Sequence, residues 1–392
     1  MKKLLALLLC LVMVIPFAGC SEEEEGFKVG FIFLHDENST YDKNFIDAAK
    51  AATEKLGLSE DQVVFKVNIP EGAECYEAAA ELADDGCDLI FADSFGHEDY
   101  MIQAAKEFSD VTFCHATGTK AHTEKLPNYF NAFASIYEGR YLAGVAAGMK
   151  INQMIEEGKF TADKAKMGYV GAFPYAEVKS GLTSFYLGAK SVCPTVTMEV
   201  KYTNSWFDIS AEKEAANALI SDGCILVSQH ADSEGAPKAC AEAGVPNVAY
   251  NIDTREWGPD TALISSKINW QPYFEHIIDA TMNDKEITQD YCGSLADGGV
   301  EILGLNETVA APGTKEKLEE VKQKLISGEI KVFDTATFTK DGATLTEYMA
   351  DVDSDAEFAP DTQAISEGYF HESEFRSAPY FDIDIDGITT IE

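Results

Sequence analysis

Short apolar runs alternate along the chain with longer segments whose apolar residues recur every three or four positions. The run KVGFIFL at 28–34 is apolar on both faces, as in a strand buried inside a parallel sheet. The segment 42–56 that follows has the apolar spacing of a helix. The alternation predicts further strands at 62–69, 87–93 and 111–116, with helices at 75–83 and 100–108. Strands alternating with helices indicate a parallel sheet covered by helices.

The pattern restarts after the segment 134–150, whose glycines lower helix propensity but permit close helix packing. It then predicts strands at 166–173, 195–202, 224–230 and 245–252, and helices at 177–191, 211–221 and 236–243. The two halves are similar in length. The expected fold class is therefore α/β, with two doubly wound parallel-sheet lobes.

The N-terminus MKKLLALLLCLVMVIPFAGC has two lysines, an apolar run and small residues before Cys20. It resembles a bacterial lipoprotein signal, which implies a signal peptide at 1–19 and a lipid on Cys20. Residues 20–26 are acidic and predict a tether. No later run reaches the roughly 20 apolar residues of a spanning helix. We expect a lipid-anchored protein on the extracytoplasmic face of the cell membrane. The alternative is an ordinary secretory signal or an uncleaved anchor.

The chain of 392 residues has a formal net charge of −37, which argues against nucleic acid as a partner. Seven cysteines follow Cys20, an odd number without CxxC spacing. This pattern gives no support to a zinc site and favours buried free thiols. No metal or cofactor is expected.

Polar and aromatic residues gather where the predicted strands end. The tails read HDENSTYD, DSFGHED and HATGTK in the first half, and AFPYAE, TNSWFD, QHADSEG and NIDTRE in the second. Ligands of open parallel sheets bind beyond the carboxyl ends of the strands. Facing each other across a cleft, these tails would form a concave binding site.

Motifs for catalysis are missing from the sequence: it has no GxSxG, no GxxxxGK[ST], no HExxH and no GxGxxG after the first strand. The histidines at strand tails, including His35 and His230, have no ligand spacing, so a hydrogen-bonding role is favoured. Trp206 and Phe207 could stack on a flat ring. Asp253 could accept hydrogen bonds from ring N–H groups or from a ribose diol. The alternative is a helix N-cap or turn residue. Lys267 is either a ligand donor, a partner of a cleft acid, or a solvated residue.

These segments resemble the basic membrane protein family of bacterial lipoproteins, which are substrate-binding components of ABC importers with the type I periplasmic-binding fold. The resemblance runs from about 27 to 333 and is carried by YDKNF, DSFGHED, YEGRYLAGVAAGMK, SWFD, NIDTREWGPD and SSKINWQPYF. Better-known members bind purine nucleosides. The resemblance therefore implies ligand contacts in the first lobe at Tyr41, Asp42, Phe45, Ser94, Phe95 and Asp99. In the second half it implies contacts at Trp206, Phe207, Asp208, Gln229, Asp253, Lys267 and Trp270. The two tryptophans 206 and 270 would favour a nucleobase such as adenine.

The domains expected are an N-terminal lobe at 27–133 completed near 267–290, and a C-terminal lobe at 134–266 completed near 291–335. A C-terminal extension follows at 336–392. The expected function is capture of a purine nucleobase or nucleoside by closure of the lobes about a hinge, for an ABC permease, without catalysis. The alternatives are another ligand such as a sugar or signalling molecule, a sensory receptor, and a surface nucleoside hydrolase.

Overall fold

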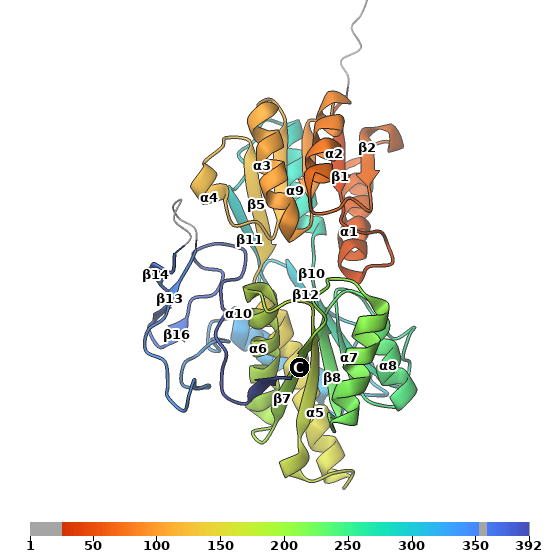
Figure 1. Ribbon diagram of the computed structural model, residues 1–392, viewed down its shortest axis with the longest axis vertical. Coiled ribbons are helices and arrows are strands. Elements are labelled where there is room, and N and C mark those ends of the chain that lie inside the picture. Colours follow the sequence, from red (N-terminus) through yellow and green to blue (C-terminus); the bar gives the residue numbers. More distant parts are fainter. Residues whose placement is uncertain (1–25, 353–358, 392) are drawn as a thin grey trace, which may run out of the picture.

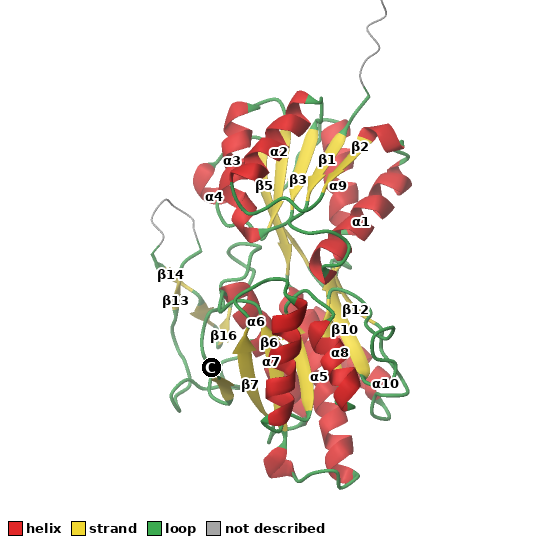
Figure 2. Ribbon diagram, turned by 45° about the vertical axis from the view of Figure 1, so that its right-hand side comes forward, coloured by secondary structure: helices red, strands yellow, loops and turns green. Residues whose placement is uncertain are grey.

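The computed structural model describes residues 26–352 and 359–391, and it shows two α/β lobes stacked along the long axis of the molecule (Figure 1). In each lobe, helices cover both faces of a mostly parallel sheet (Figure 2). The expected fold class is confirmed. The signal peptide, Cys20 and most of the acidic tether lie outside the described residues.

The first lobe contains a six-stranded sheet in the order β11-β5-β4-β3-β1-β2, with every neighbouring pair parallel. Its elements are β1 (Val29–Ile32), α1 (Thr40–Leu56), β2 (Val63–Lys66), α2 (Ala73–Asp84), β3 (Leu89–Ala92), α3 (Glu98–Glu107), β4 (Thr112–Ala116), α4 (Ala121–Glu124), β5 (Tyr129–Ala134), α9 (Gln271–Met282) and β11 (Asp290–Gly293).

The second lobe contains a seven-stranded sheet in the order β12-β10-β9-β8-β6-β7-β17, in which only the β10–β12 pair is antiparallel. Its elements are α5 (Ile136–Glu156), β6 (Lys166–Gly171), α6 (Ala176–Val192), β7 (Thr197–Tyr202), α7 (Ile209–Ser221), β8 (Leu226–His230), α8 (Gly235–Ala243), β9 (Asn247–Tyr250), β10 (Ala262–Ile268), β12 (Val300–Leu303), α10 (Thr314–Ile326) and β17 (Ile388–Thr390).

The chain crosses between the lobes three times before its C-terminal part. It leaves the first sheet after β5, returns with α9 and β11, and leaves again before β12. Helix α9 is held in the first lobe by the edge-on contact of Phe274 with Phe31 of β1, with ring centroids 5.3 Å apart. Strand β11 ends at Gly293, slightly beyond the lobe boundary near 290 expected from sequence. Three adjacent crossings make a connection that can bend as a hinge.

Helices α5 and α6 of the second lobe pack with their backbones in unusually close approach. A Cβ atom placed on Gly144 would lie 2.0 Å from the carbonyl oxygen of Phe185. A Cβ atom on Gly188 would lie 2.0 Å from the carbonyl oxygen of Tyr141. The small residues that sequence analysis identified in 134–150 therefore form a helix–helix contact that only glycine permits at these positions.

The C-terminal extension is folded onto the second lobe, beside α6 (Figure 1). Its short strands are β13 (Met349–Ala350), β14 (Thr362–Gln363), β15 (Ile365–Ser366) and β16 (Tyr369–Phe370). Strand β17 pairs in parallel with β7 and becomes an edge of the second sheet. An aromatic cluster also holds the extension in place. Phe381 stacks on Phe333 with ring centroids 4.3 Å apart, and it packs edge-on against Phe370 at 4.9 Å. Sequence analysis had assigned no structural role to this segment.

The seven cysteines of the described chain are unpaired, and all except the half-buried Cys292 are buried. Within residues 26–352 and 359–391, no helix has both the length and the apolar character required to cross a bilayer.

Candidate ligand-binding site

A pocket lies where the carboxyl ends of the two sheets meet. Both sheets have the same strand order, β2-β1-β3 in the first lobe and β7-β6-β8 in the second. In each sheet, β1 or β6 lies between its two neighbours, and the helical connections on its two sides pass over opposite faces of the sheet. Ligands of α/β sheets bind in the crevice between these connections. The pocket encloses about 360 Å³ of empty space, its mouth included. Its lining residues are Leu34, His35, Tyr41, Asp42, Ser94, Phe95 and Thr117 from the first lobe and Glu177, Trp206, His230 and Asp232 from the second.

The loop after β1 is organised by the carboxylate of Asp42. The backbone N–H of His35 donates to Asp42 Oδ1 at 2.7 Å, and Ser39 Oγ donates to Asp42 Oδ2 at 2.5 Å. Burial raises the pKa of Asp42, but the hydrogen bonds from His35 and Ser39 outweigh it, and the net pKa is lowered. Asp42 is therefore an ionised, fully hydrogen-bonded carboxylate that holds the pocket wall in shape.

The second lobe contributes buried acids that have few partners. Asp232 is 5% exposed, and the amide of Asn251 lies 3.4 Å from its Oδ1. Burial, together with the nearby carboxyls of Glu212, Asp42 and Glu177, holds the pKa of Asp232 well above its usual value. His230 Nε2 lies 3.5 Å from Glu177 Oε1, and burial lowers the pKa of His230. Buried polar groups that lack partners are costly in a folded protein, which points to a ligand that completes them.

Carboxyl groups and imidazoles supply most of the polar chemistry of the pocket. Of the described residues that line it, none is Lys or Arg. A phosphate or carboxylate ligand would meet Asp42, Glu177 and Asp232 without a compensating cation. The pocket instead suits an uncharged or cationic ligand with N–H groups, which would donate to these oxygens.

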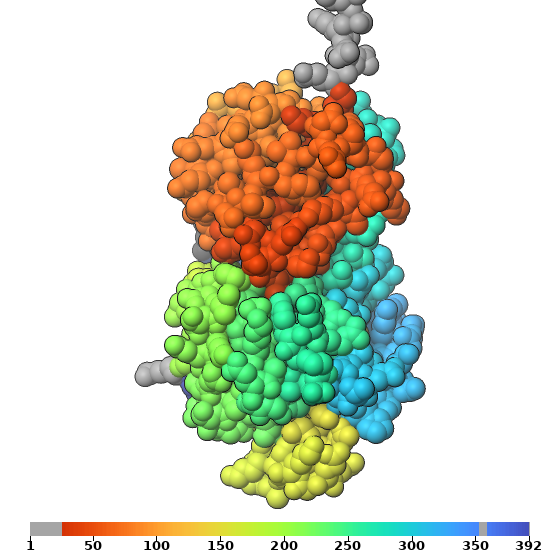
Figure 3. Space-filling model, turned by 90° about the vertical axis from the view of Figure 1, so that its right-hand side faces the viewer, coloured from red at the N-terminus to blue at the C-terminus, as the bar shows by residue number. Residues whose placement is uncertain are grey.

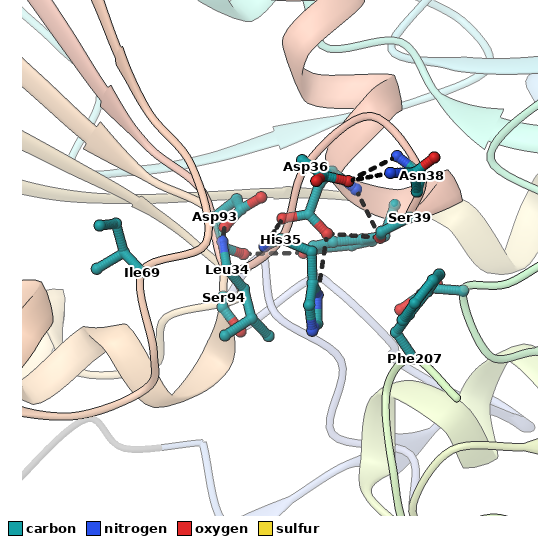
Figure 4. Close-up of polar contacts among 12 residues, drawn as sticks. Leu34, His35, Asp36, Asn38, Ser39, Ile69, Asp93, Ser94 and Phe207 are labelled. Carbon is teal, nitrogen blue, oxygen red and sulfur yellow. Dashed lines mark hydrogen bonds and ion pairs between the residues drawn. The ribbon is translucent and has the colours of Figure 1, made fainter. Parts of the chain in front are cut away.

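Aromatic rings form part of the pocket and make contacts across the gap between the lobes. Trp206 is half-buried in the wall and packs edge-on against Phe173, with centroids 5.2 Å apart. His35 of the first lobe and Phe207 of the second face each other at 5.4 Å (Figure 4). Phe95 and Tyr175 make a second pair between the lobes, at 5.8 Å.

The two lobes are closed onto each other in this conformation. Besides the ring pairs, the backbone N–H of Thr40 at the start of α1 donates to the carbonyl oxygen of Asp232 at 2.7 Å. The space-filling view shows the first lobe, in red and orange, resting directly on the green residues of the second (Figure 3). Groups from both lobes therefore face the pocket at the same time.

The structure brings together several of the residues that sequence analysis selected. Tyr41, Asp42, Ser94, Phe95 and Trp206 all line the pocket. The Tyr41 hydroxyl donates to the carbonyl oxygen of Asp93 at 3.0 Å, and Ser94 Oγ donates to Glu71 Oε1 at 2.6 Å. Phe207 lies next to the pocket, against His35.

Three of the selected residues lie inside the core. Phe45 and Trp270 are at most 1% exposed and stack on each other, with ring centroids 4.5 Å apart. Phe45 lies on the face of α1 that packs on the sheet, and Trp270 precedes α9, so both rings fill the first lobe. Gln229 is fully buried, and its Nε2 donates to the carbonyl oxygens of Ala231 and Ser233 at 3.3 Å. Of the three, Phe45 packs edge-on against the lining residue Tyr41, with ring centroids 4.8 Å apart.

Four selected polar residues lie outside the pocket. Asp208 caps α7 by accepting from the Ala211 N–H at 2.9 Å. Asp99 is exposed and pairs with Lys120. Asp253 pairs with Arg255, and Lys267 Nζ lies 3.7 Å from Glu301 Oε2. Asp253 and Lys267 both line a separate groove, because β9 and β10 stand beyond the central strands β6 and β8.

Other lining residues were not selected from sequence, although all of them except Leu34, which ends the predicted strand 28–34, stood in a recognised strand tail. Leu34, Thr117, Glu177 and Asp232 carried no distinguishing signal, and the histidines 35 and 230 were noted only as candidates for hydrogen bonding. The order of the strands identifies them, since every lining residue lies at the end of β1, β3, β4, β6, β7 or β8 or in the segment that follows it.

Comparison with known proteins finds relatives in sequence and in fold. Residues 31–336 match the family described as PnrA-like ABC transporter substrate-binding protein (Bmp). A purine-binding protein of Brucella abortus is 33% identical over 328 residues, covering 83% of this chain and 88% of that protein. A Haloferax volcanii protein assigned as an ABC transporter glucose-binding protein is 29% identical, covering 79% of this chain and 72% of its own length. Among solved structures, an ABC transporter solute-binding protein of Aeropyrum pernix matches with a TM-score of 0.65 and 18% identity, covering 78% of this chain and 93% of that one.

Proposed function

The chain belongs to the PnrA-like family of ABC transporter substrate-binding proteins, and from this membership we propose that its ligand is a purine nucleobase or nucleoside. The relative from Brucella abortus, named as purine-binding, supports this choice. The observation that carries the proposal is the pocket itself. It joins the indole of Trp206 to the hydrogen-bond acceptors Glu177 and Asp232 and has no lining Lys or Arg among the described residues.

A purine base has the matching chemistry. Its flat ring can stack on an indole, and its ring N–H and exocyclic amine groups can donate to carboxyl oxygens. The mechanism we propose is closure of the two lobes about the three crossings, with the base held between groups of both lobes. Because these groups meet only when the lobes are closed, the ligand shifts the equilibrium towards closure. The closed form would then deliver the ligand to an ABC permease.

Calorimetric titration tests the proposal. The full-length chain would be purified in detergent, refolded to remove any carried ligand, and titrated with adenine, adenosine, guanosine and inosine. Ribose and glucose serve as competitors from another class, since one relative is assigned to glucose. If no purine binds more tightly than about 1 mM, near −4 kcal/mol, the proposal fails. Tighter binding of glucose would favour a sugar ligand, and turnover of a nucleoside would favour a hydrolase.

Replacement of Trp206 by alanine is expected to weaken purine binding by at least about 1 kcal/mol, or roughly fivefold, through loss of stacking. The same titration measures the change. Trp257→Ala is the matched control, because Trp257 is half-buried in the separate groove. Unchanged affinity in a folded Trp206→Ala variant would show that Trp206 does not stack on the ligand.

We further propose that Cys20 carries a lipid that anchors the protein on the extracytoplasmic face of the membrane. The signal-like sequence that ends at Cys20 supports this. Mass spectrometry of the N-terminal peptide of the membrane-bound protein is expected to show a chain that starts at Cys20 with attached acyl groups. A chain that starts elsewhere, or an unmodified Cys20, would refute the anchor.

A further inference from the structure

A second groove opens directly beside the inner pocket. It shares three wall residues with the pocket, namely Phe95, Thr117 and Glu177. It is much larger, with about 1490 Å³ of empty space against about 360 Å³ for the inner pocket, mouths included in both. We call it the outer groove. The two spaces are therefore neighbours at these three residues.

The outer groove has three walls. The first lobe supplies Thr117 and Thr119, and the second lobe supplies Tyr175. The C-terminal extension supplies the third wall, which includes Tyr348, Met349 and Asp382. The family match ends at residue 336, so this third wall belongs to a part of the chain that the family match does not cover.

The extension is fixed firmly enough to act as a wall. Besides its strand pairing with β7, Lys179 Nζ of α6 lies 2.8 Å from Asp384 Oδ1 and donates to the carbonyl oxygen of Asp382 at 3.2 Å. On the other side, the backbone N–H of Ser377 donates to Asp290 Oδ2 of the first lobe at 2.8 Å. The extension therefore contacts both lobes.

The junction between the two spaces is marked by the rings of Phe95 and Tyr175. Both side chains are large, apolar and exposed, at 47% and 45%. Their centroids lie 5.8 Å apart across the gap between the lobes. Exposed aromatic rings at the mouth of a pocket are suitable contacts for a ligand that projects outwards.

The chemistry of the outer groove differs from that of the inner pocket. Its polar groups include the hydroxyls of Thr117, Thr119 and Tyr348 and the carboxylates of Glu177 and Asp382, and the Tyr348 hydroxyl donates to Asp382 Oδ1. Lys120 and Arg376 also line it; Lys120 is paired with Asp99, and Arg376 donates to backbone carbonyls. Hydroxyls and carboxylates placed among aromatic rings match a sugar, whose hydroxyl groups both donate and accept.

We propose that the outer groove is a subsite for the sugar of a nucleoside whose base occupies the inner pocket, with the C-terminal extension as the wall that determines how large a substituent is accepted. This inference rests on the proposed purine ligand.

The test compares adenine with adenosine on the full-length protein. Met349→Trp places a bulky ring in the outer groove from an exposed position, at 45% exposure, where the fold tolerates it. Phe375→Trp is the matched control, because Phe375 is also exposed, at 43%, and lies in the extension outside the groove walls. Thermal unfolding verifies that both variants fold like the wild type.

The expected result is that Met349→Trp weakens adenosine binding by about tenfold and leaves adenine binding unchanged, whereas Phe375→Trp changes neither. Three outcomes would overturn the outer subsite and leave the purine proposal standing. They are equal effects of Met349→Trp on both ligands, no effect on adenosine, and a wild type that binds adenine but not adenosine. A wild type that binds no purine at all would refute the proposed function and the subsite with it.

Discussion

Replacement of Asp232 by alanine is expected to weaken purine binding by about ten- to a hundredfold. The side chain is 5% exposed in the pocket wall, and its closest described polar neighbour, the Asn251 amide, is 3.4 Å away. Ring N–H groups of a bound base would therefore be its main donors. Its removal would leave buried N–H groups of the base without an acceptor, which costs about 1–3 kcal/mol and spans this range of affinity. Titration of the variant with adenine and adenosine measures it.

The same residue is expected to reduce the stability of the ligand-free protein as the pH rises. The pKa of Asp232 is raised well above its usual value in the folded state by burial and neighbouring carboxyls, and it is about 3.9 in an unfolded chain. Between these two pKa values the folded protein holds a proton that the unfolded chain has lost. The free energy of unfolding therefore falls as the pH rises from about 4 towards the folded pKa.

Asp232→Asn keeps the shape of the side chain and removes this titration. Its free energy of unfolding, measured by urea without ligand, is expected to depend less on pH than that of the wild type. Asp260→Ala is the control for both measurements, since Asp260 is an exposed acid of the same lobe. Full affinity in Asp232→Ala, or an unchanged pH profile in Asp232→Asn, would contradict the role assigned to this carboxyl group.

Gly188→Val is expected to destabilise the protein by about 3 kcal/mol. A Cβ atom at this position would lie 2.0 Å from the backbone carbonyl oxygen of Tyr141, and backbone cannot rotate aside as a side chain can. Helices α5 and α6 would have to separate, and the apolar contacts between them would be lost. Urea unfolding measures the change in the free energy of unfolding.

The control for this variant is Ser191→Val, which introduces the same side chain at an exposed position of the same helix. It separates the clash from the lower helix propensity of valine, which is well below 1 kcal/mol. A Gly188→Val protein within about 1 kcal/mol of the control would show that the two helices can move apart without loss of stability.

The local pattern predicted the central elements of both lobes well. The apolar run KVGFIFL became β1 (Val29–Ile32), and the periodic segment 42–56 became most of α1 (Thr40–Leu56). The pattern did not identify β10, α9, β11 and β12, which follow the two regular halves and cross between the lobes. It also missed the extension, since the short strand β17 has no signal of its own and is ordered by pairing with β7.

The residues of the candidate site were likewise predicted from the sequence only in part. Sequence placed Trp206 and Asp232 in strand tails, and tails of parallel strands meet at one edge of a sheet. It equally selected Asp253 and Lys267, whose strands lie further from the centre of the sheet, and Phe45 and Trp270, whose rings pack in the core.

Sequence by itself determined the alternation of strands and helices, the two α/β lobes and the residues that stand at the ends of the strands. These follow from apolar periodicity and from turn residues, which are properties of neighbouring positions. Tertiary structure alone decided which strand ends face each other and that the C-terminal extension reaches the mouth of the pocket. The reason is that strand order and lobe closure depend on contacts between residues far apart in the chain, which no local pattern specifies.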